Sequence, residues 1–302
     1  MSNLKRMVDY NLFQQEMYRL SQIRYTSYVD TMKEIGIGYL GKPNSSAKLA
    51  HNGEIHMLTY CLYLASSNAS GINVCPKSDM CKHDCLVGSG YARVDTLSGK
   101  TNIIDSRITK TRLFFANRDL FMKLMCIEIK RAQNKAKRLG YGFSIRLNGT
   151  SDISPLAFRK DGKNILQMYP NVTFYDYTKV KNYWKIADKY PNYHITFSRD
   201  GSIENENECL EWLKKGKGHN VAVVFGVTNK NELPKTWKGY KVIVGDNYDY
   251  RPWDLNFDGQ IVGLIYKKNG NDYKLGTDGK RHFMGVPKNP FIVDINSKDC
   301  GW

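Results

Sequence analysis

The sequence has no apolar run long enough to cross a membrane. Its longest apolar stretch, residues 57–65, is interrupted by Thr59 and is far shorter than the roughly 20 residues that a transmembrane helix needs. The opening residues, MSNLKRMVDY, lack the apolar core of a secretory signal peptide. We therefore expect a cytoplasmic protein that has no membrane partner.

Several catalytic and binding motifs are also missing. There is no GxSxG nucleophile elbow and no GxxxxGK[ST] phosphate loop, which speaks against a serine hydrolase and a P-loop nucleotidase. No paired CxxC…CxxC occurs, so the usual zinc ribbon is not indicated. Low-complexity tracts are absent, and the 41% hydrophobic content is that of an ordinary globular protein.

Acidic residues are few relative to basic ones. The chain has 29 Asp and Glu against 45 Lys and Arg, which gives a formal net charge of +16. A field of this sign attracts polyanions and speeds their encounter with the protein. The charge indicates nucleic acid or a nucleotide as a partner, while a solubilising surface is the simpler alternative. The oligomeric state is not indicated.

Apolar, β-rich runs that end in polar residues recur along the chain, with helical or loop segments between them. One covers residues 56–65, and six more begin near residues 143, 172, 193, 221, 241 and 261. Strands that alternate with helices predict an α/β fold with a parallel sheet. The short later spacings favour a partial or irregular parallel (β/α) barrel over a regular eightfold one.

Helical signals lie before and between these strands. Phe13, Met17, Leu20 and Ile23 recur at helical spacing, so we expect residues 1–45 to be an N-terminal helical appendage to a single barrel-like domain at 46–302. Asn117 predicts the start of a helix that ends at Gly140. Further helices are expected at 180–190 and 203–215. The basic last turns of the helix before Gly140 favour a solvated face over a phosphate site.

Three of the seven cysteines gather in CPKSDMCKHDC, at Cys75, Cys81 and Cys85. Clustered cysteines in a reducing cytoplasm indicate metal binding rather than disulfides. Thiolates select iron–sulfur clusters or zinc, and three of them can hold a [4Fe-4S] cluster with one iron left open. Zinc would need His83, which is cramped between Cys81 and Cys85, and Cys61 is an alternative fourth ligand that core packing explains more simply.

The carboxyl ends of parallel strands share one edge of a sheet, and the polar residues at these ends are therefore candidate site residues. Any single one could instead be a helix cap, a turn residue or a satisfied core side chain. As candidate catalytic residues the pattern gives Asp176, Lys179, His194, Asp249 and Arg251. As candidate ligand-binding residues it gives Asn148, Gly149, Thr150, Ser151 and Asp152.

The segments SGINVCPKSDMCKHDCL, TKTRLFFANRDLF, IRLNGTSDIS, FYDYTK and GDNYDYRPWD resemble bacteriophage and plasmid proteins that are often labelled gene-product-88-like. The resemblance spans roughly residues 47–287. It implies a mobile-element protein, hence the host cytoplasm, and a cysteine loop that belongs to the family pattern; it supplies no reaction. This sequence departs from the family pattern at Tyr250 and at Pro252-Trp253, whereas Arg251 and Asp254 agree with it.

The cysteine loop after a first strand also resembles that of radical SAM enzymes, on a partial (β/α) barrel. This likeness implies S-adenosylmethionine as a second cofactor, near Asn148-Gly149-Thr150. The usual spacing there is Cys-x3-Cys-x2-Cys, however, whereas this chain has Cys-x5-Cys-x3-Cys.

Three functions are compatible with these features. The first is a [4Fe-4S] radical-SAM-like enzyme that acts on a nucleotide or nucleic acid. The second is a nucleic-acid-binding phage protein in which the cluster is structural, and the 20 tyrosines could then stack on bases. The third is a cluster-dependent small-molecule enzyme that uses no SAM.

Overall fold

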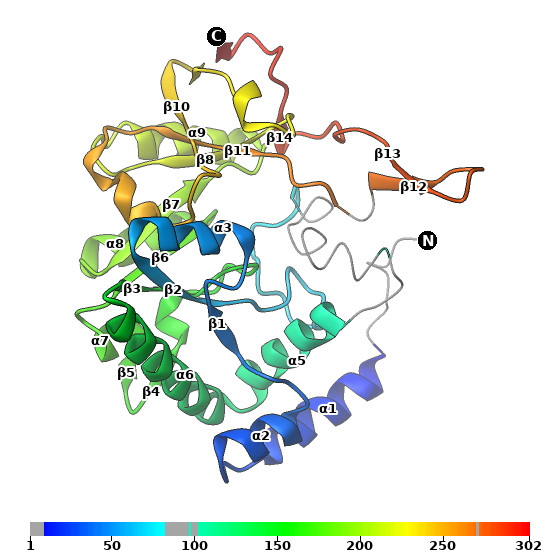
Figure 1. The fold of residues 1–302 in the computed structure, drawn as a ribbon, viewed down its shortest axis with the longest axis vertical. Helices are drawn as coiled ribbons and strands as arrows, with labels where there is room; N and C mark the ends of the chain where they lie inside the picture. Colours follow the sequence, from blue (N-terminus) through cyan, green and yellow to red (C-terminus); the bar gives the residue numbers. More distant parts are fainter. Residues whose placement is uncertain (1–8, 82–96, 98–101, 270–271) are drawn as a thin grey trace. The chain divides into compact units, whose positions relative to one another are not determined.

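The computed structural model describes residues 9–81, 97, 102–269 and 272–302. These residues group into two compact units (Figure 1). The first comprises Met1–Pro76, Thr101–Asp176 and Tyr190–Tyr193, and the second comprises Lys77–Lys100, Tyr177–Lys189 and His194–Trp302.

The first unit is built on the parallel strands β2, β3 and β6, with β1 antiparallel to β2. Its strands are β1 (Gly41–Pro43), β2 (Met57–Leu62), β3 (Gly142–Arg146), β4 (Arg159–Lys160), β5 (Lys163–Asn164) and most of β6 (Thr173–Thr178). Its helices are α1 (Tyr10–Gln22), α2 (Tyr28–Ile35), α3 (Ala47–Ala50), η2 (His51–Ile55), α5 (Asn102–Ala116), α6 (Arg118–Leu139), η4 (Pro155–Ala157) and α7 (Ile165–Met168).

Helix α6 begins and ends as the sequence predicts. The Asn117 side chain accepts a hydrogen bond from the backbone N–H of Leu120, and Gly140 closes the helix in the left-handed conformation at φ +68°. The buried face of α6 packs on β1, β2 and β3 and includes Phe121, Leu124, Met125 and Ile129. Burial of these side chains on the sheet supplies the core of the first unit.

The second unit has the parallel order β7, β8, β11, β10. Strand β14 is parallel to β8, while β9 and β15 are antiparallel additions. Its strands are β7 (Tyr193–Ser198), β8 (Val221–Phe225), β9 (Thr236–Trp237), β10 (Tyr240–Val244), β11 (Ile261–Ile265), β12 (Tyr273–Leu275), β13 (Arg281–Phe283), β14 (Ile292–Val293) and β15 (Cys300–Gly301). Its helices are η5 (Lys181–Tyr183), α8 (Trp184–Lys189), α9 (Ile203–Leu213), η6 (Lys230–Glu232) and η7 (Arg251–Asn256).

The predicted α/β class with a largely parallel sheet is confirmed, and all seven predicted strands are present as β2, β3, β6, β7, β8, β10 and β11. Among the described strands, no pairing closes either unit into a barrel. The helices expected at 180–190 and 203–215 are found as η5 with α8 and as α9. None of the described helices is both long and apolar enough to cross a membrane.

The N-terminal segment contains two helices and a strand, where the sequence predicted a helical appendage. Helix α1 packs along α5 (Figure 1), and β1 pairs with β2. The backbone N–H groups of Leu40 and Gly41 donate to the buried carboxylate of Glu128 on α6, at 2.8 and 2.9 Å. Strand β1 thus makes residues 41–43 part of the sheet of the first unit. As a division into domains, 1–45 against 46–302 stays a prediction.

Candidate functional site at the carboxyl ends of β2 and β3

The loop that follows β3 is organised by Asn148. Its side-chain oxygen accepts hydrogen bonds from the hydroxyl of Ser151 at 2.8 Å and from the backbone N–H of Ile153 at 2.9 Å. Its side-chain nitrogen donates to the Ile153 carbonyl at 2.9 Å and to Asp176 at 3.0 Å. Asn148 is 2% exposed, so these bonds hold the predicted ligand-binding loop in one conformation.

Asp176 on β6 is the carboxylate beneath this loop. Its Oδ1 accepts the backbone N–H of Asn148 at 2.8 Å, and the hydroxyl of Tyr193 lies 3.5 Å from its Oδ2. Burial raises the pKa of Asp176 to about 7, although the bonds from Asn148 and the charge of Arg146 oppose the shift. The group can therefore gain or lose a proton near neutral pH.

Gly149 and Thr150 attach the loop to the end of β2. The Gly149 N–H donates to the Leu62 carbonyl at 2.9 Å, and the Thr150 hydroxyl donates to the Leu64 carbonyl at 2.5 Å. A Cβ atom at Gly149 would lie 2.6 Å from the ring of Tyr63. Only glycine fits this close approach, so the glycine predicted to bind a cofactor has a packing role here.

Cys75 lies beside the same loop. The backbone N–H of Asp152 donates to the carbonyl of Val74 at 2.8 Å, and the Cys75 thiol lies 3.8 Å from the Thr150 carbonyl. Cys75 is half-buried. Within the first unit, the structure thus brings together Cys75, Asp176 and the five predicted ligand-binding residues.

The other two cysteines of the predicted metal site are placed differently. Cys81 belongs to the second unit, where its half-buried thiol lies 3.8 Å from the Ser78 carbonyl. Cys85 and His83 lie outside the described residues. Across the ranges that the structure describes, no three His, Cys, Asp or Glu side chains are grouped to hold a metal ion. Cys61, the alternative fourth ligand, is fully buried within β2.

Two of the predicted catalytic residues belong to a buried charge cluster in the second unit. Arg251 forms an ion pair with Asp254 at 3.0 Å and donates to the Tyr248 carbonyl at 2.8 Å. Burial alone would lower the pKa of Arg251, but Tyr177, Asp254 and Asp249 outweigh it and raise the pKa. Because Arg251 and Asp249 are 4% and 1% exposed, this cluster supports the turn after β10.

His194 does not lie where the sequence places it. It is the second residue of β7, so it belongs to the amino end of that strand and not to the carboxyl end. Burial lowers its pKa, which keeps the imidazole neutral at pH 7. Lys179 follows β6 as expected, and its ammonium lies 5.6 Å from the centre of the Phe291 ring.

The sequence matches a protein-family model. The Gene product 88 family model matches residues 40–294, more than four-fifths of the sequence. The chain belongs to the Gene product 88 family. No curated protein and no solved structure matches it. The resemblance to gene-product-88-like proteins is confirmed, and the likeness to radical SAM enzymes finds no support.

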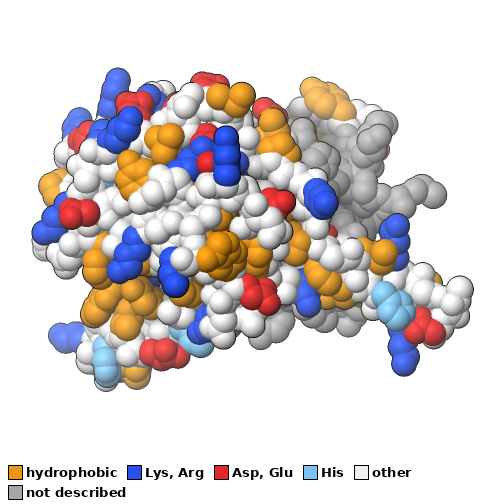
Figure 2. All heavy atoms as spheres, turned by 90° about the horizontal axis from the view of Figure 1, so that it is seen from above, with side chains coloured by type: hydrophobic (Ala, Val, Ile, Leu, Met, Phe, Trp, Pro, Cys, Tyr) orange, Lys and Arg blue, Asp and Glu red, His pale blue; other side chains and the backbone are white. Residues whose placement is uncertain are grey.

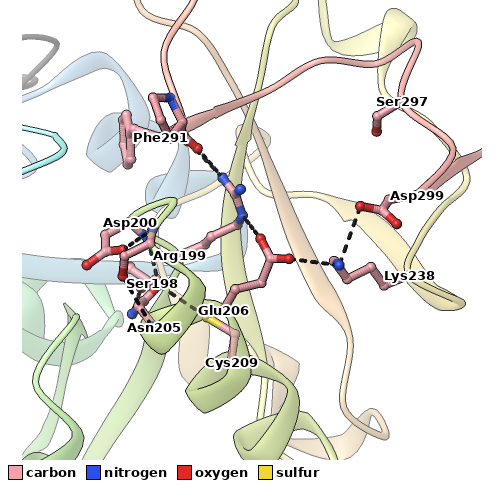
Figure 3. Close-up of polar contacts among 12 residues, drawn as sticks. Ser198, Arg199, Asp200, Asn205, Glu206, Cys209, Lys238, Phe291, Ser297 and Asp299 are labelled. Carbon is pink, nitrogen blue, oxygen red and sulfur yellow. Dashed lines mark hydrogen bonds and ion pairs between the residues drawn. The ribbon is translucent and has the colours of Figure 1, made fainter.

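The span matched by the Gene product 88 family model contains every predicted site residue. It also contains all but Asp299 of an ion-pair network that the sequence did not reveal (Figure 3). Glu206 on α9 contacts Arg199 at 2.9 Å and Lys238 at 2.7 Å. Burial raises the pKa of Glu206, but these two cations outweigh it and lower the pKa. Arg199 also donates to the Pro290 carbonyl at 2.7 Å, and Lys238 lies 3.4 Å from Asp299.

This network ties residues 290–299 to β7 and α9 in the second unit. It was missed because its members are spread between residues 199 and 299 and each is an ordinary surface residue type. Only Arg199, directly after β7, carried a strand-end signal.

On the face of this Gene product 88 protein that Figure 2 draws, basic side chains are dispersed among other types. Figure 2 shows Lys and Arg side chains scattered among acidic, apolar and polar ones, with no continuous basic patch among the described residues of the face drawn. A single large polyanion-binding surface is therefore not evident on that face.

Proposed function

We propose that this Gene product 88 protein is a [4Fe-4S]-dependent enzyme whose site lies at the carboxyl ends of β2 and β3. The observation that carries the proposal is the position of the Cys75 thiol, 3.8 Å from the Thr150 carbonyl, beside the loop that Asn148 and Asp176 hold. A soft ligand, a fixed polar loop and a carboxyl that titrates near neutral pH occur together in one unit.

The cysteines of the loop suit this role. Cys75 and Cys81 are half-buried, whereas Cys61 and Cys209 are buried in the cores of their units. Burial raises the pKa of Cys209, which keeps its thiol protonated and inert. Cys75, Cys81 and Cys85 would hold the cluster, which supplies electron transfer and one open iron as a Lewis acid.

The residues of the first unit would position the substrate and move protons. Ser151 and Asp152 lie on the loop fixed by Asn148, and their backbone and side-chain groups are the proposed ligand contacts. Asp176, with a pKa of about 7, would accept or deliver a proton near the loop, with the Tyr193 hydroxyl as its neighbour. Roles for Lys179, His194, Asp249 and Arg251 stay predictions.

A narrower version adds S-adenosylmethionine as a ligand and a nucleotide or nucleic acid as the substrate, on a partial barrel of the radical-SAM type. The cysteine loop after β2 and the glycine-containing loop after β3 support this version. A cluster-dependent enzyme that uses no SAM has the same cysteine requirement. SAM binding and cleavage by the reduced protein separate the two versions.

The proposal is tested by iron and sulfide analysis after anaerobic reconstitution. We expect about four iron and four sulfide per chain in the wild type, as the cluster type requires. Cys75→Ala, Cys81→Ala and Cys85→Ala should each lose most of this iron. Cys300→Ala, which removes a half-exposed thiol outside the motif, is the matched control and should keep it. A wild-type protein without iron would overturn the proposal.

A further inference from the structure

The exposed face of α6 carries a regular row of cations in the first unit. We define the α6 cationic stripe as Lys123, Lys130, Arg131, Lys137 and Arg138, all of which are exposed. Lys123, Lys130 and Lys137 are seven residues apart, and so are Arg131 and Arg138. At 1.5 Å per residue the row repeats about every 10.5 Å and spans about 22 Å.

No acidic side chain of α6 offsets this row. Asp119 lies in the first turn of the helix, and Glu128 is buried and accepts hydrogen bonds from Tyr28, Tyr60, Leu40 and Gly41. Within the described residues, no ion pair joins a stripe cation to a carboxylate. The charge of the stripe is therefore directed to the solvent.

Aromatic rings hold two of these cations in place. The guanidinium of Arg131 lies 4.1 Å from the centre of the Tyr28 ring, and the ammonium of Lys123 lies 3.8 Å from that of Tyr25. The Tyr28 hydroxyl is itself held by Glu128 at 2.6 Å. Beside Arg131, the side chains of Asn134, Lys137 and Arg138 line a shallow recess of about 480 Å³. Arg131, held in this way at the recess, loses less side-chain entropy when an anion binds.

We infer that the α6 cationic stripe binds the phosphate backbone of a nucleic acid without reading its sequence. A periodic row of Lys and Arg with a central amide, Asn134, matches a linear array of phosphates, and its contacts are of the sequence-independent kind. A membrane surface fits less well, because the apolar face of α6 is buried against β1, β2 and β3 and cannot enter lipid. This inference is independent of the cysteine site.

The test compares two variants that lower the net charge of +16 equally. The stripe variant is Lys130→Gln, Lys137→Gln and Arg138→Gln, while the control is Lys185→Gln, Lys214→Gln and Lys274→Gln, three exposed lysines elsewhere in the chain. Binding to duplex DNA, single-stranded DNA and RNA is measured by fluorescence anisotropy over a range of salt concentrations.

We expect the stripe variant to bind at least about tenfold more weakly and to lose about three units of the slope of log K against log salt, one for each cation removed. The control should bind within about twofold of the wild type. Equal losses in both variants would contradict the inference, and so would a wild type that binds phosphatidylserine vesicles but none of the nucleic acids. Cys75→Ala should bind like the wild type, which separates this result from the cluster proposal.

Discussion

The two units stabilise a buried and a partly buried carboxylate in opposite ways. In the first unit, Asp176 receives amide hydrogen bonds from Asn148, and burial raises its pKa to about 7. In the second unit, Glu206 lies between Arg199 and Lys238, which lower its pKa. The neighbours thus decide the role of each acid. Asp176 can exchange a proton near neutral pH, whereas Glu206 stays ionised and holds the C-terminal segment.

The contrast between Asp176 and Glu206 should be clearest in the pH dependence of the free energy of unfolding. The unfolded Asp176 carboxyl has a pKa near 3.9. Between that pH and about 7 the folded protein holds a proton that the unfolded chain has released, so stability falls as pH rises. The contribution is at most about 1.4 kcal/mol per pH unit.

Asp176→Asn should remove this decrease in the free energy of unfolding with rising pH. The measurement is urea unfolding at about pH 4.5 and about pH 7.5, with the wild-type minus variant difference isolating the Asp176 carboxyl. A difference that does not change with pH would show that Asp176 has an ordinary pKa, and the contrast with Glu206 would fail.

Asn148→Ala should have the next largest effect on the free energy of unfolding. It removes one of the hydrogen bonds to Asp176 and leaves the hydroxyl of Ser151 and the backbone groups of Ile153 buried without their Asn148 partner. We expect about 3 kcal/mol less free energy of unfolding. Asn134→Ala, at an exposed position on α6, is the matched control and should change stability by less than about 0.5 kcal/mol. Equal losses in the two variants would refute the central role of Asn148.

Glu206→Gln should lower the free energy of unfolding by less, about 1 kcal/mol, because Glu206 and its cationic partners are partly exposed to solvent. Since the folded pKa of Glu206 is lowered, its contribution is present above the unfolded pKa near 4.3 and is lost as pH falls through the folded value. Hydrogen exchange of residues 290–301 should accelerate in the variant. Glu211→Gln, which breaks an exposed pair with Lys181, is the control and should leave that exchange unchanged.

Much of the sheet could be predicted from the sequence. The seven main strands are apolar runs of five or six residues bounded by polar ones, and the buried runs of β2 and β8 leave little ambiguity. The two ends of α6 were equally predictable, because Asn117 caps its start and Gly140 closes its end through contacts within the helix. These features depend on neighbours in the sequence.

Features that depend on distant contacts were missed. Helix α5 has a weak pattern because Lys110 and Thr111 are buried in it beside Leu113 and Phe114, so its apolar face is interrupted. Strand β1 has only three residues and is defined by its pairing with β2 and by the Glu128 carboxylate. His194 was assigned to the wrong edge although the strand start near residue 193 was predicted correctly, because the second residue of a strand lies at its amino end.

The sequence predicted that several of the candidate residues lie near one another, but not what each of their side chains contacts. The sequence predicted that Asn148 to Asp152 follow a strand end and lie near Cys75, and the structure has them in these positions. The strand-end pattern could not show that Asn148 uses its side-chain oxygen and nitrogen within the loop, or that Gly149 is required by the nearby Tyr63 ring. Contact of these residues with a ligand stays a prediction.

The most direct test of the proposed site is alkylation of the anaerobically reconstituted protein, read at each cysteine by mass spectrometry. Thiolates bound to a cluster are not free to react. We predict that Cys75, Cys81 and Cys85 are protected until the iron is chelated, whereas the rate at Cys300 is the same before and after chelation. Alkylation of Cys75 at the same rate before and after chelation would contradict a cluster at this position.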